Sequence, residues 1–100
     1  MKLKIKNAKL KMDEKKRLRL NLKKAKSLIE RIERMVEEDE YCPKIMQQIL
    51  AAIGLLRSVH KGLMVRHLKT CFVEAAKSGD KKKQQEMIEE ILKVIDLYNK

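Results

Sequence analysis

Three side chains of this 100-residue sequence, Cys42, His67 and Cys71, are the most capable of binding a metal ion. They lie at the two ends of a series of positions spaced three or four residues apart, which is the mark of one face of a helix. The series runs through Cys42, Ile45, Ile49, Ala52, Leu56, Val59, Leu63, His67 and Cys71. Its apolar middle predicts a packing surface, and its ends carry thiol and imidazole groups that suit soft metal ions.

The spacing predicts a site shared by two copies of the chain. A helix rises 1.5 Å per residue, so the path from Cys42 to His67 covers roughly 37 Å, and one chain cannot bring both side chains to one ion. An antiparallel copy, related by a two-fold axis near Leu55 and Leu56, would place Cys42 of one protomer beside His67 and Cys71 of the other. Two thiolates and one imidazole suit Cu(I), whereas structural Zn(II) usually takes a fourth ligand.

An ordinary structural role is the alternative for each of these residues taken singly. A lone buried cysteine usually behaves as a small hydrophobic residue, and a histidine on an apolar face is more often a hydrogen-bonded core residue than a ligand. The joint placement of Cys42, His67 and Cys71 favours a metal site. His60 lies beside the series with no second ligand one turn away, which favours an ordinary surface or interface position.

Composition predicts an all-α protein, because three aromatic residues, three glycines and one proline accompany abundant Lys, Glu, Leu, Ile and Met. The length predicts one domain, residues 1–100, whose thin core favours oligomerisation. Apolar periodicity and cap residues, among them Ser78-Gly79-Asp80, predict helices at about 13–39, 43–77 and 80–98. A basic arm, residues 1–12, precedes them as a flexible segment or an edge strand.

Several functional classes are excluded by what the sequence lacks. No nucleophile, base and oxyanion constellation is apparent, so we expect no enzyme activity. No apolar run approaches the length of a membrane span, and the N-terminus does not resemble a signal peptide. We therefore expect a cytoplasmic protein, in which both cysteines stay reduced.

Positive charge is concentrated at the N-terminal end. Residues 1–26 contain twelve Lys or Arg against Asp13 and Glu14, which gives +10 of the total +11. This concentration of charge predicts a polyanion partner. Nucleic acid is favoured over a membrane surface because residues 1–26 contain no Trp or Phe that could anchor the segment in a membrane. A solvated lysine tail that only aids solubility is the alternative. The candidate contacts are Lys15, Lys16, Arg17, Arg19, Lys23, Lys24 and Lys26.

The chain resembles the copper-sensitive operon repressor (CsoR) family of bacterial metal- and thiol-sensing repressors from about Leu18 to the C-terminus. The residues that carry the resemblance are Arg34-Met35-Val36-Glu37-Glu38-Asp39-Glu40-Tyr41-Cys42, Gln48-Ile49, Ala51-Ala52 and His67-Leu68-Lys69-Thr70-Cys71. The Tyr-Cys pair and the later His-x-x-x-Cys are the most specific part.

The resemblance implies a three-helix protomer and an antiparallel dimer whose four long helices form a bundle, commonly assembled as a dimer of dimers, a homotetramer. It implies that the apo protein binds operator DNA and that Cu(I), held by Cys42 of one chain and His67 and Cys71 of the other, releases it. It also implies an outer shell around the histidine, formed by Tyr41 and a third-helix glutamate. The candidates for that glutamate are Glu86 and Glu90.

Ligand sets distinguish the subgroups of the family. Nickel or cobalt sensors carry additional N-terminal histidines, the formaldehyde sensor lacks the second cysteine, and persulfide sensors lack the histidine, so this chain resembles the copper sensors. Its nucleic-acid face departs from the family. Lys24-Ala25-Lys26-Ser27-Leu28 replaces an Arg-Ile-Glu-Gly-Gln-like stretch, and Ile53 replaces an arginine, for which Arg57, one turn further on, is the candidate substitute.

The sequence favours a Cu(I)-sensing transcriptional repressor. One rival is a copper-buffering protein whose basic arm does not read DNA. The other is a thiol or persulfide sensor in which Cys42 and Cys71 of different chains cross-link.

Overall fold

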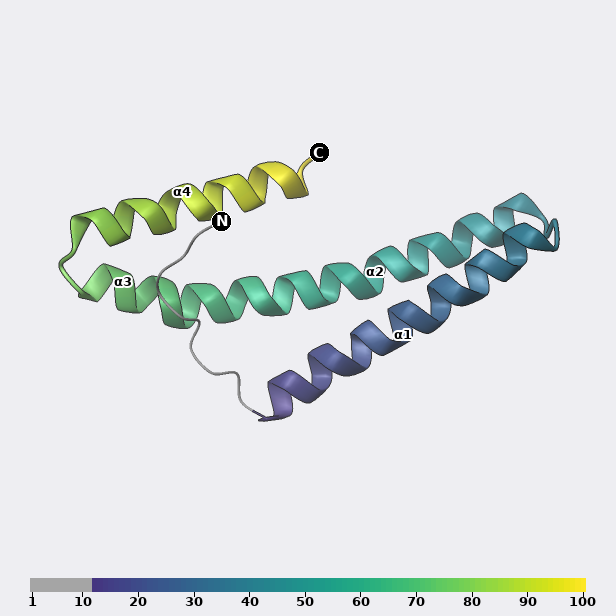
Figure 1. The fold of residues 1–100 in the computed structure, drawn as a ribbon, viewed down its shortest axis with the longest axis horizontal. Coiled ribbons are helices and arrows are strands. Elements are labelled where there is room, and N and C mark those ends of the chain that lie inside the picture. Colours follow the sequence, from purple (N-terminus) through teal and green to yellow (C-terminus); the bar gives the residue numbers. More distant parts are fainter. Residues whose placement is uncertain (1–11) are drawn as a thin grey trace. The chain divides into compact units, whose positions relative to one another are not determined.

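The computed structural model describes residues 12–100, and within this range the chain is helical without any strand (Figure 1). The elements are α1 (Met12–Glu37), α2 (Cys42–His67), a π-helical turn η1 (Leu68–Phe72), α3 (Val73–Lys77) and α4 (Lys81–Tyr98). The predicted all-α fold class is confirmed. The predicted basic arm falls on residues 1–12, of which 1–11 lie outside the described residues.

The second predicted helix contains a π-helical turn that periodicity did not predict. α2, η1 and α3 follow one another without a break from residue 42 to residue 77. Within η1, the hydroxyl of Thr70 donates a 2.6 Å hydrogen bond to the backbone carbonyl of Arg66. Such a side-chain bond competes with the regular backbone ladder and often bends helices. Single π-helical turns inside α-helices occur frequently at functional sites.

The first helix ends at Glu37, about two residues before the predicted end. Asp39 adopts the left-handed conformation, with φ of 54°. The amide of Glu40 donates to the carbonyl of Met35 at 2.9 Å, and the amide of Asp39 donates to the carbonyl of Val36 at 3.2 Å. These two bonds are the Schellman arrangement, which satisfies the last carbonyls of a helix and stops it.

α2 begins at Cys42, five residues after the last residue of α1. The carbonyl of Tyr41 accepts hydrogen bonds from the amides of Lys44 at 3.0 Å and Ile45 at 3.3 Å. The bond from Ile45 is the first α-helical bond, so Cys42 is the first residue of the helix and Pro43 the second. Proline fits there because the first amides of a helix have no backbone partner within it.

The chain forms two compact units, one containing residues 12–63 and the other residues 64–100. We describe each unit by itself, and the organisation of residues 1–100 as one domain stays a prediction. Within the described residues, no helix has the combined length and apolar character that crossing a membrane requires.

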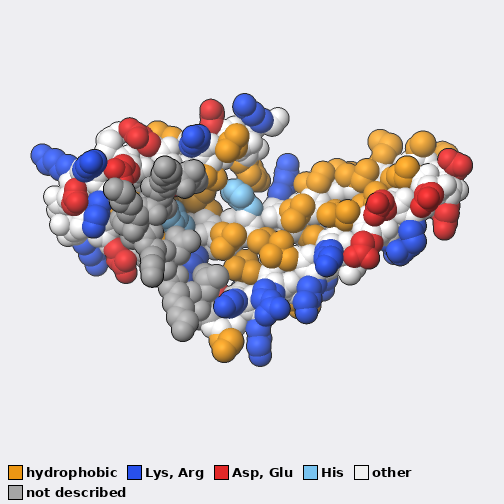
Figure 2. Space-filling model, in the orientation of Figure 1, with side chains coloured by type: hydrophobic (Ala, Val, Ile, Leu, Met, Phe, Trp, Pro, Cys, Tyr) orange, Lys and Arg blue, Asp and Glu red, His pale blue; other side chains and the backbone are white. Residues whose placement is uncertain are grey.

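In the unit of residues 12–63, α1 and the first part of α2 pack through small side chains. Ala25 on α1 and Ala52 and Val59 on α2 are its buried residues. A side chain on Gly62 would come within 3.2 Å of Leu18 on α1, so glycine permits this contact. This small core leaves many large apolar side chains of the unit in contact with solvent (Figure 2).

In the unit of residues 64–100, α4 packs against η1 and α3. The side chain of Met87 is completely buried against Cys71 and Ala75. A hydrogen bond of 3.0 Å from the side-chain amide of Gln84 to the backbone carbonyl of Ala76 joins α4 to the end of the preceding helix. These contacts fix the position of α4 along η1 and α3.

The connection between α3 and α4 confirms the predicted stop and start. Gly79 has φ of 73°, the left-handed conformation that glycine adopts without steric cost. The carboxylate of Asp80 then accepts hydrogen bonds from the amides of Lys82 at 3.0 Å and Lys83 at 3.3 Å. Asp80 is therefore the N-cap of α4.

Candidate metal centre

The first candidate ligand, Cys42, is a free and exposed thiol at the first position of α2. Its neighbour Tyr41 is also exposed, with 70% of its surface accessible. The sharp turn at Asp39 and the carbonyl of Tyr41 fix the start of the helix. The helix start therefore presents Cys42 where a group from outside this unit can reach it.

The other two candidate ligands, His67 and Cys71, lie where α2 passes into the π-helical turn. His67 is half-buried and is the last residue of α2. Cys71 lies inside η1 and is only 3% exposed, because Met87 covers it from α4. The Sγ atom of Cys71 lies 3.7 Å from the hydroxyl of Thr70. The four-residue spacing keeps His67 and Cys71 about one turn apart, as predicted from the sequence.

No group of three or more His, Cys, Asp or Glu side chains that could hold a metal ion forms within the part of the chain that the structure describes. His67 and Cys71 belong to one unit and Cys42 to the other. The donors themselves fit a soft ion, since thiolate and imidazole are the preferred ligands of Cu(I) and Zn(II). Within one chain, His67 and Cys71 are therefore a pair of candidate donors and Cys42 is a separate one.

The candidate outer-shell glutamates, Glu86 and Glu90, are both half-buried on α4. They differ in their position relative to Met87. Glu90 is turned about 60° from Met87 around the helix and Glu86 about 100° in the same sense, so the two glutamates share a face and differ mainly by one turn along α4. His60 is half-buried on α2.

The candidate nucleic-acid contacts are all exposed. Lys and Arg side chains line α1 (Figure 2). The exposed predicted residues are Lys15, Lys16, Arg17, Arg19, Lys23, Lys24 and Lys26 on α1 and Arg57 on α2. Ile53 stands where the family that the sequence resembles usually has an arginine, and it is 40% exposed.

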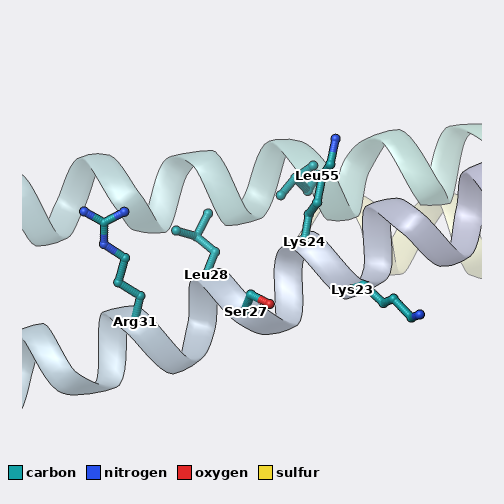
Figure 3. Close-up of a pocket in the computed structure, with 6 residues that line it drawn as sticks. All are labelled: Lys23, Lys24, Ser27, Leu28, Arg31 and Leu55. Atoms are coloured by element: carbon teal, nitrogen blue, oxygen red, sulfur yellow. The ribbon is translucent and has the colours of Figure 1, made fainter.

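A pocket of about 440 Å³ on this surface includes residues that the sequence prediction missed. Lys23, Lys24, Ser27, Leu28 and Arg31 of α1 and Leu55 of α2 line it (Figure 3). The predicted contacts included Lys23 and Lys24 but neither Ser27 nor Arg31. The sequence does indicate that Ser27 and Arg31 share a surface with Lys24, because the three residues follow the three-to-four spacing of one helix face.

The described residues form a helical protein with His67 and Cys71 about one turn apart, a separate exposed Cys42, and a basic surface on α1. The family model described as metal-sensitive transcriptional repressor matches residues 14–97. The chain belongs to this family, and it is therefore a regulator and not an enzyme. No solved structure gives a significant match.

Curated relatives of the chain are similar over most of its length. It is 34% identical over 85 residues to the copper-sensing transcriptional repressor CsoR of Mycobacterium ulcerans, an alignment that covers 84% of this chain and 70% of the relative. It is 33% identical over 87 residues to the protein of the same name from Bacillus subtilis, with coverage of 87% and 83%. Identity to the CsoR protein of Mycobacterium tuberculosis is 37% over 82 residues, with coverage of 81% and 66%.

Proposed function

We propose that this protein is a Cu(I)-sensing transcriptional repressor. In the proposal, the apo protein binds operator DNA and leaves it when Cu(I) binds across the interface of an antiparallel dimer. Cys42 of one protomer and His67 and Cys71 of the other are the ligands. The observation that carries the proposal is the presence of this soft donor set in a chain of the metal-sensitive repressor family.

The donor set supports Cu(I) over harder ions. Two sulfurs and one nitrogen form a three-coordinate set, and structural Zn(II) would need a fourth ligand. Bound Cu(I) would supply metal–sulfur and metal–nitrogen bonds that join the two chains. His67 and Cys71 are one turn apart on the same helix and can act as a pair, while exposed Cys42 is free to approach the pair of a second chain.

The exposed apolar face of α2 supports a dimer. Ile49, Leu56 and Leu63 of the predicted packing series are 41%, 44% and 47% exposed, although Ala52 and Val59 of the same series are buried. Large apolar surfaces in contact with water usually mark an interaction site. A second α2 packed antiparallel on this face would bury it and bring Cys42 to the level of His67 of the other chain.

Metal binding and DNA binding are linked in the proposal. Cu(I) bound at both ends of the α2 pair would change the positions of the two α1 helices, so that their basic side chains no longer match the spacing of the DNA phosphates. A coupling free energy of roughly 1–3 kcal/mol between the two ligands is typical of such switches. Further assembly of dimers into a tetramer would multiply the number of basic surfaces.

Glu90 is the glutamate that we propose for the outer shell of His67. Gln84 contacts Ala76 and Met87 contacts Cys71, so positions further along α4 oppose earlier positions of η1 and α2. Glu90 lies about one turn beyond Met87 along α4, so we expect it at the level of His67. Partners that hydrogen-bond to ligating histidines orient the ring, and losing one typically costs 10–100-fold in metal affinity or activity.

We therefore expect Glu90→Gln to weaken the copper-linked release from DNA by about tenfold or more, and Glu86→Gln to leave it nearly unchanged. The two variants remove the same charge from the same helix, so each controls for the other. The measurement is the ratio of DNA affinities with and without Cu(I). Equal ratios for the two variants would reject Glu90 as the outer-shell partner.

The burial of Cys71 weighs against the thiol-sensor alternative. Oxidation and persulfidation of cysteine depend on exposure of the thiolate, and Cys71 is only 3% exposed. A disulfide between Cys42 and Cys71 of different chains would require Met87 to move away from the thiol. The copper-buffering alternative differs from the proposal only in DNA recognition.

The proposal is tested by DNA binding with and without copper. A duplex selected from a random library on the reduced apo protein serves as the candidate operator, and a scrambled duplex of equal length serves as its control. We expect preference for the selected duplex at fixed salt and loss of that preference on addition of Cu(I). Equal affinity for both duplexes, unaffected by copper, would reject the repressor function and favour copper buffering.

The salt dependence of binding tests the role of the basic part of α1. Each neutralised phosphate contributes about −0.9 to the slope of log affinity against log salt concentration. Replacing Lys15, Lys16, Arg17 and Arg19 with alanine should flatten this slope and leave Cu(I) affinity intact, because the four side chains are exposed and are not metal ligands. An unchanged slope would show that this part of α1 does not contact phosphates.

A further inference from the structure

The pocket between α1 and α2 has the features of a site for a phosphate group. Lys24 and Arg31 both extend from α1 toward α2, on either side of Leu28, while Lys23 extends away from α2 (Figure 3). Lys24 and Arg31 are seven residues apart, or roughly 10 Å along the helix axis. Their charged ends point apart in Figure 3, so the two cations flank Leu28 and can contact neighbouring groups of a polyanion.

The lining is both basic and apolar. Lys23, Lys24 and Arg31 are its charged members, no carboxylate lines the pocket, and Ser27 adds a hydroxyl that can donate a hydrogen bond. Leu28 and Leu55 form its apolar part. Cations and a hydroxyl suit a phosphate group, and the arginine can bind two of its oxygens at once. The leucines suit the carbon atoms of an attached sugar.

We propose that this pocket holds the sugar–phosphate backbone of duplex DNA. Lys24 and Arg31 bind neighbouring phosphodiesters, Ser27 donates a hydrogen bond to one of them, and Leu28 and Leu55 contact the deoxyribose between them. The inference rests on the proposed function in one respect, that the partner of the protein is DNA. It adds Ser27 and Arg31 to the proposed nucleic-acid contacts and assigns Lys24 to the DNA backbone. Contacts to the backbone orient the protein on the duplex and do not read its base sequence.

The choice of DNA over other anions follows from charge and shape. The pocket opens on the surface of α1 that carries the exposed basic residues, so a long polyanion can occupy the pocket and contact its neighbours together. A free phosphate ion has no carbon atoms that could pack against Leu28 and Leu55. An anionic lipid headgroup shares the phosphate chemistry and is distinguished by the experiment.

The test compares variants inside and outside the pocket on the full-length protein. Arg31→Ala and Lys24→Ala remove one cation each from the lining, and Arg34→Ala removes one from the same helix outside it. All three side chains are exposed, so the thermal unfolding of the variants should match that of the wild type. Arg31→Lys keeps the charge but loses the two-pronged geometry of the guanidinium.

Binding is measured on a scrambled duplex over a series of salt concentrations, so that operator recognition is not needed. We expect Arg31→Ala and Lys24→Ala to reduce the salt slope by about 0.9 for each protomer that contacts the duplex, and Arg34→Ala to leave it unchanged. Arg31→Lys should restore the slope but bind more weakly than the wild type at fixed salt.

Two results would overturn the proposal. Equal slopes for Arg31→Ala, Lys24→Ala and Arg34→Ala would show that the pocket holds no phosphate of the duplex. A loss confined to binding of phosphatidylserine vesicles, with the duplex unaffected, would assign the pocket to a membrane surface. Failure of the proposed repressor function would appear separately, as equal wild-type affinity for the selected and scrambled duplexes.

Discussion

Replacing Cys42 with alanine is expected to lower Cu(I) affinity by more than about 100-fold, because even the loss of an outer-shell partner of a metal ligand can cost that much. Cys42 is exposed, so its removal should leave the free energy of unfolding of the apo protein unchanged. Competition with a Cu(I) chelator measures the affinity, and X-ray absorption should detect two sulfur neighbours and one nitrogen in the wild type. Nitrogen and oxygen neighbours alone would contradict the site.

Cys71→Ala is the companion of this variant and separates ligation from packing. It should lower Cu(I) affinity as strongly, but it should also destabilise the apo protein by about 1 kcal/mol, because its sulfur is buried against Ala75 and Met87. Met87→Ala controls for the packing effect, since it disturbs the same cluster and retains all three proposed ligands. Wild-type Cu(I) affinity in Cys71→Ala would remove Cys71 from the site.

Leu56→Asp is expected to dissociate the dimer. In an antiparallel pair with its two-fold axis near Leu56, the change occurs twice at the centre of the interface and places two unpaired carboxylates there. The cost of burying unpaired charge is roughly 3 kcal/mol or more, which corresponds to at least a 100-fold increase in the dimer dissociation constant. Sedimentation at several protein concentrations measures this change.

The same variant should also lose the shared metal site, although Cys42, His67 and Cys71 are all retained. The control is Leu97→Asp on α4, where the wild-type leucine is 61% exposed and lies outside the predicted packing series. It should keep both the wild-type oligomeric state and Cu(I) affinity. A Leu56→Asp protein that is monomeric and still binds Cu(I) with wild-type affinity would place all the ligands within one chain.

The helical fold could be predicted because local signals in the sequence agree with it. Gly79 and Asp80 determine the end of one helix and the start of the next through backbone geometry and capping, which are local effects. The stop of α1 was harder to locate, because it depends on Asp39, a residue without a strong preference for the left-handed conformation. The π-helical turn involves a bond between the side chain of Thr70 and a carbonyl, which apolar periodicity does not record.

The candidate ligands stay a prediction from the sequence, and their surroundings could not be predicted from it. Residue type and spacing were enough to select Cys42, His67 and Cys71. The burial of Cys71 under Met87 depends on how far α4 slides along η1 and α3, and sequence spacing does not determine this offset. The pocket between α1 and α2 illustrates the same point, because Leu55 of α2 completes a surface whose other residues all lie on α1.

The central claim, that two chains share each metal site, is tested most directly by mixing two inactive variants. A heterodimer of Cys42→Ala and Cys71→Ala protomers can be isolated with two different affinity tags. In an antiparallel dimer, one site of this heterodimer loses both cysteines, and the other keeps Cys42 of one chain and His67 and Cys71 of the other.

We expect the heterodimer to bind one Cu(I) with wild-type affinity and a spectrum of two sulfurs and one nitrogen, whereas neither homodimer of the variants does so. If the heterodimer binds Cu(I) no better than the two variant homodimers, the ligands of each site do not come from different chains, and the account is wrong.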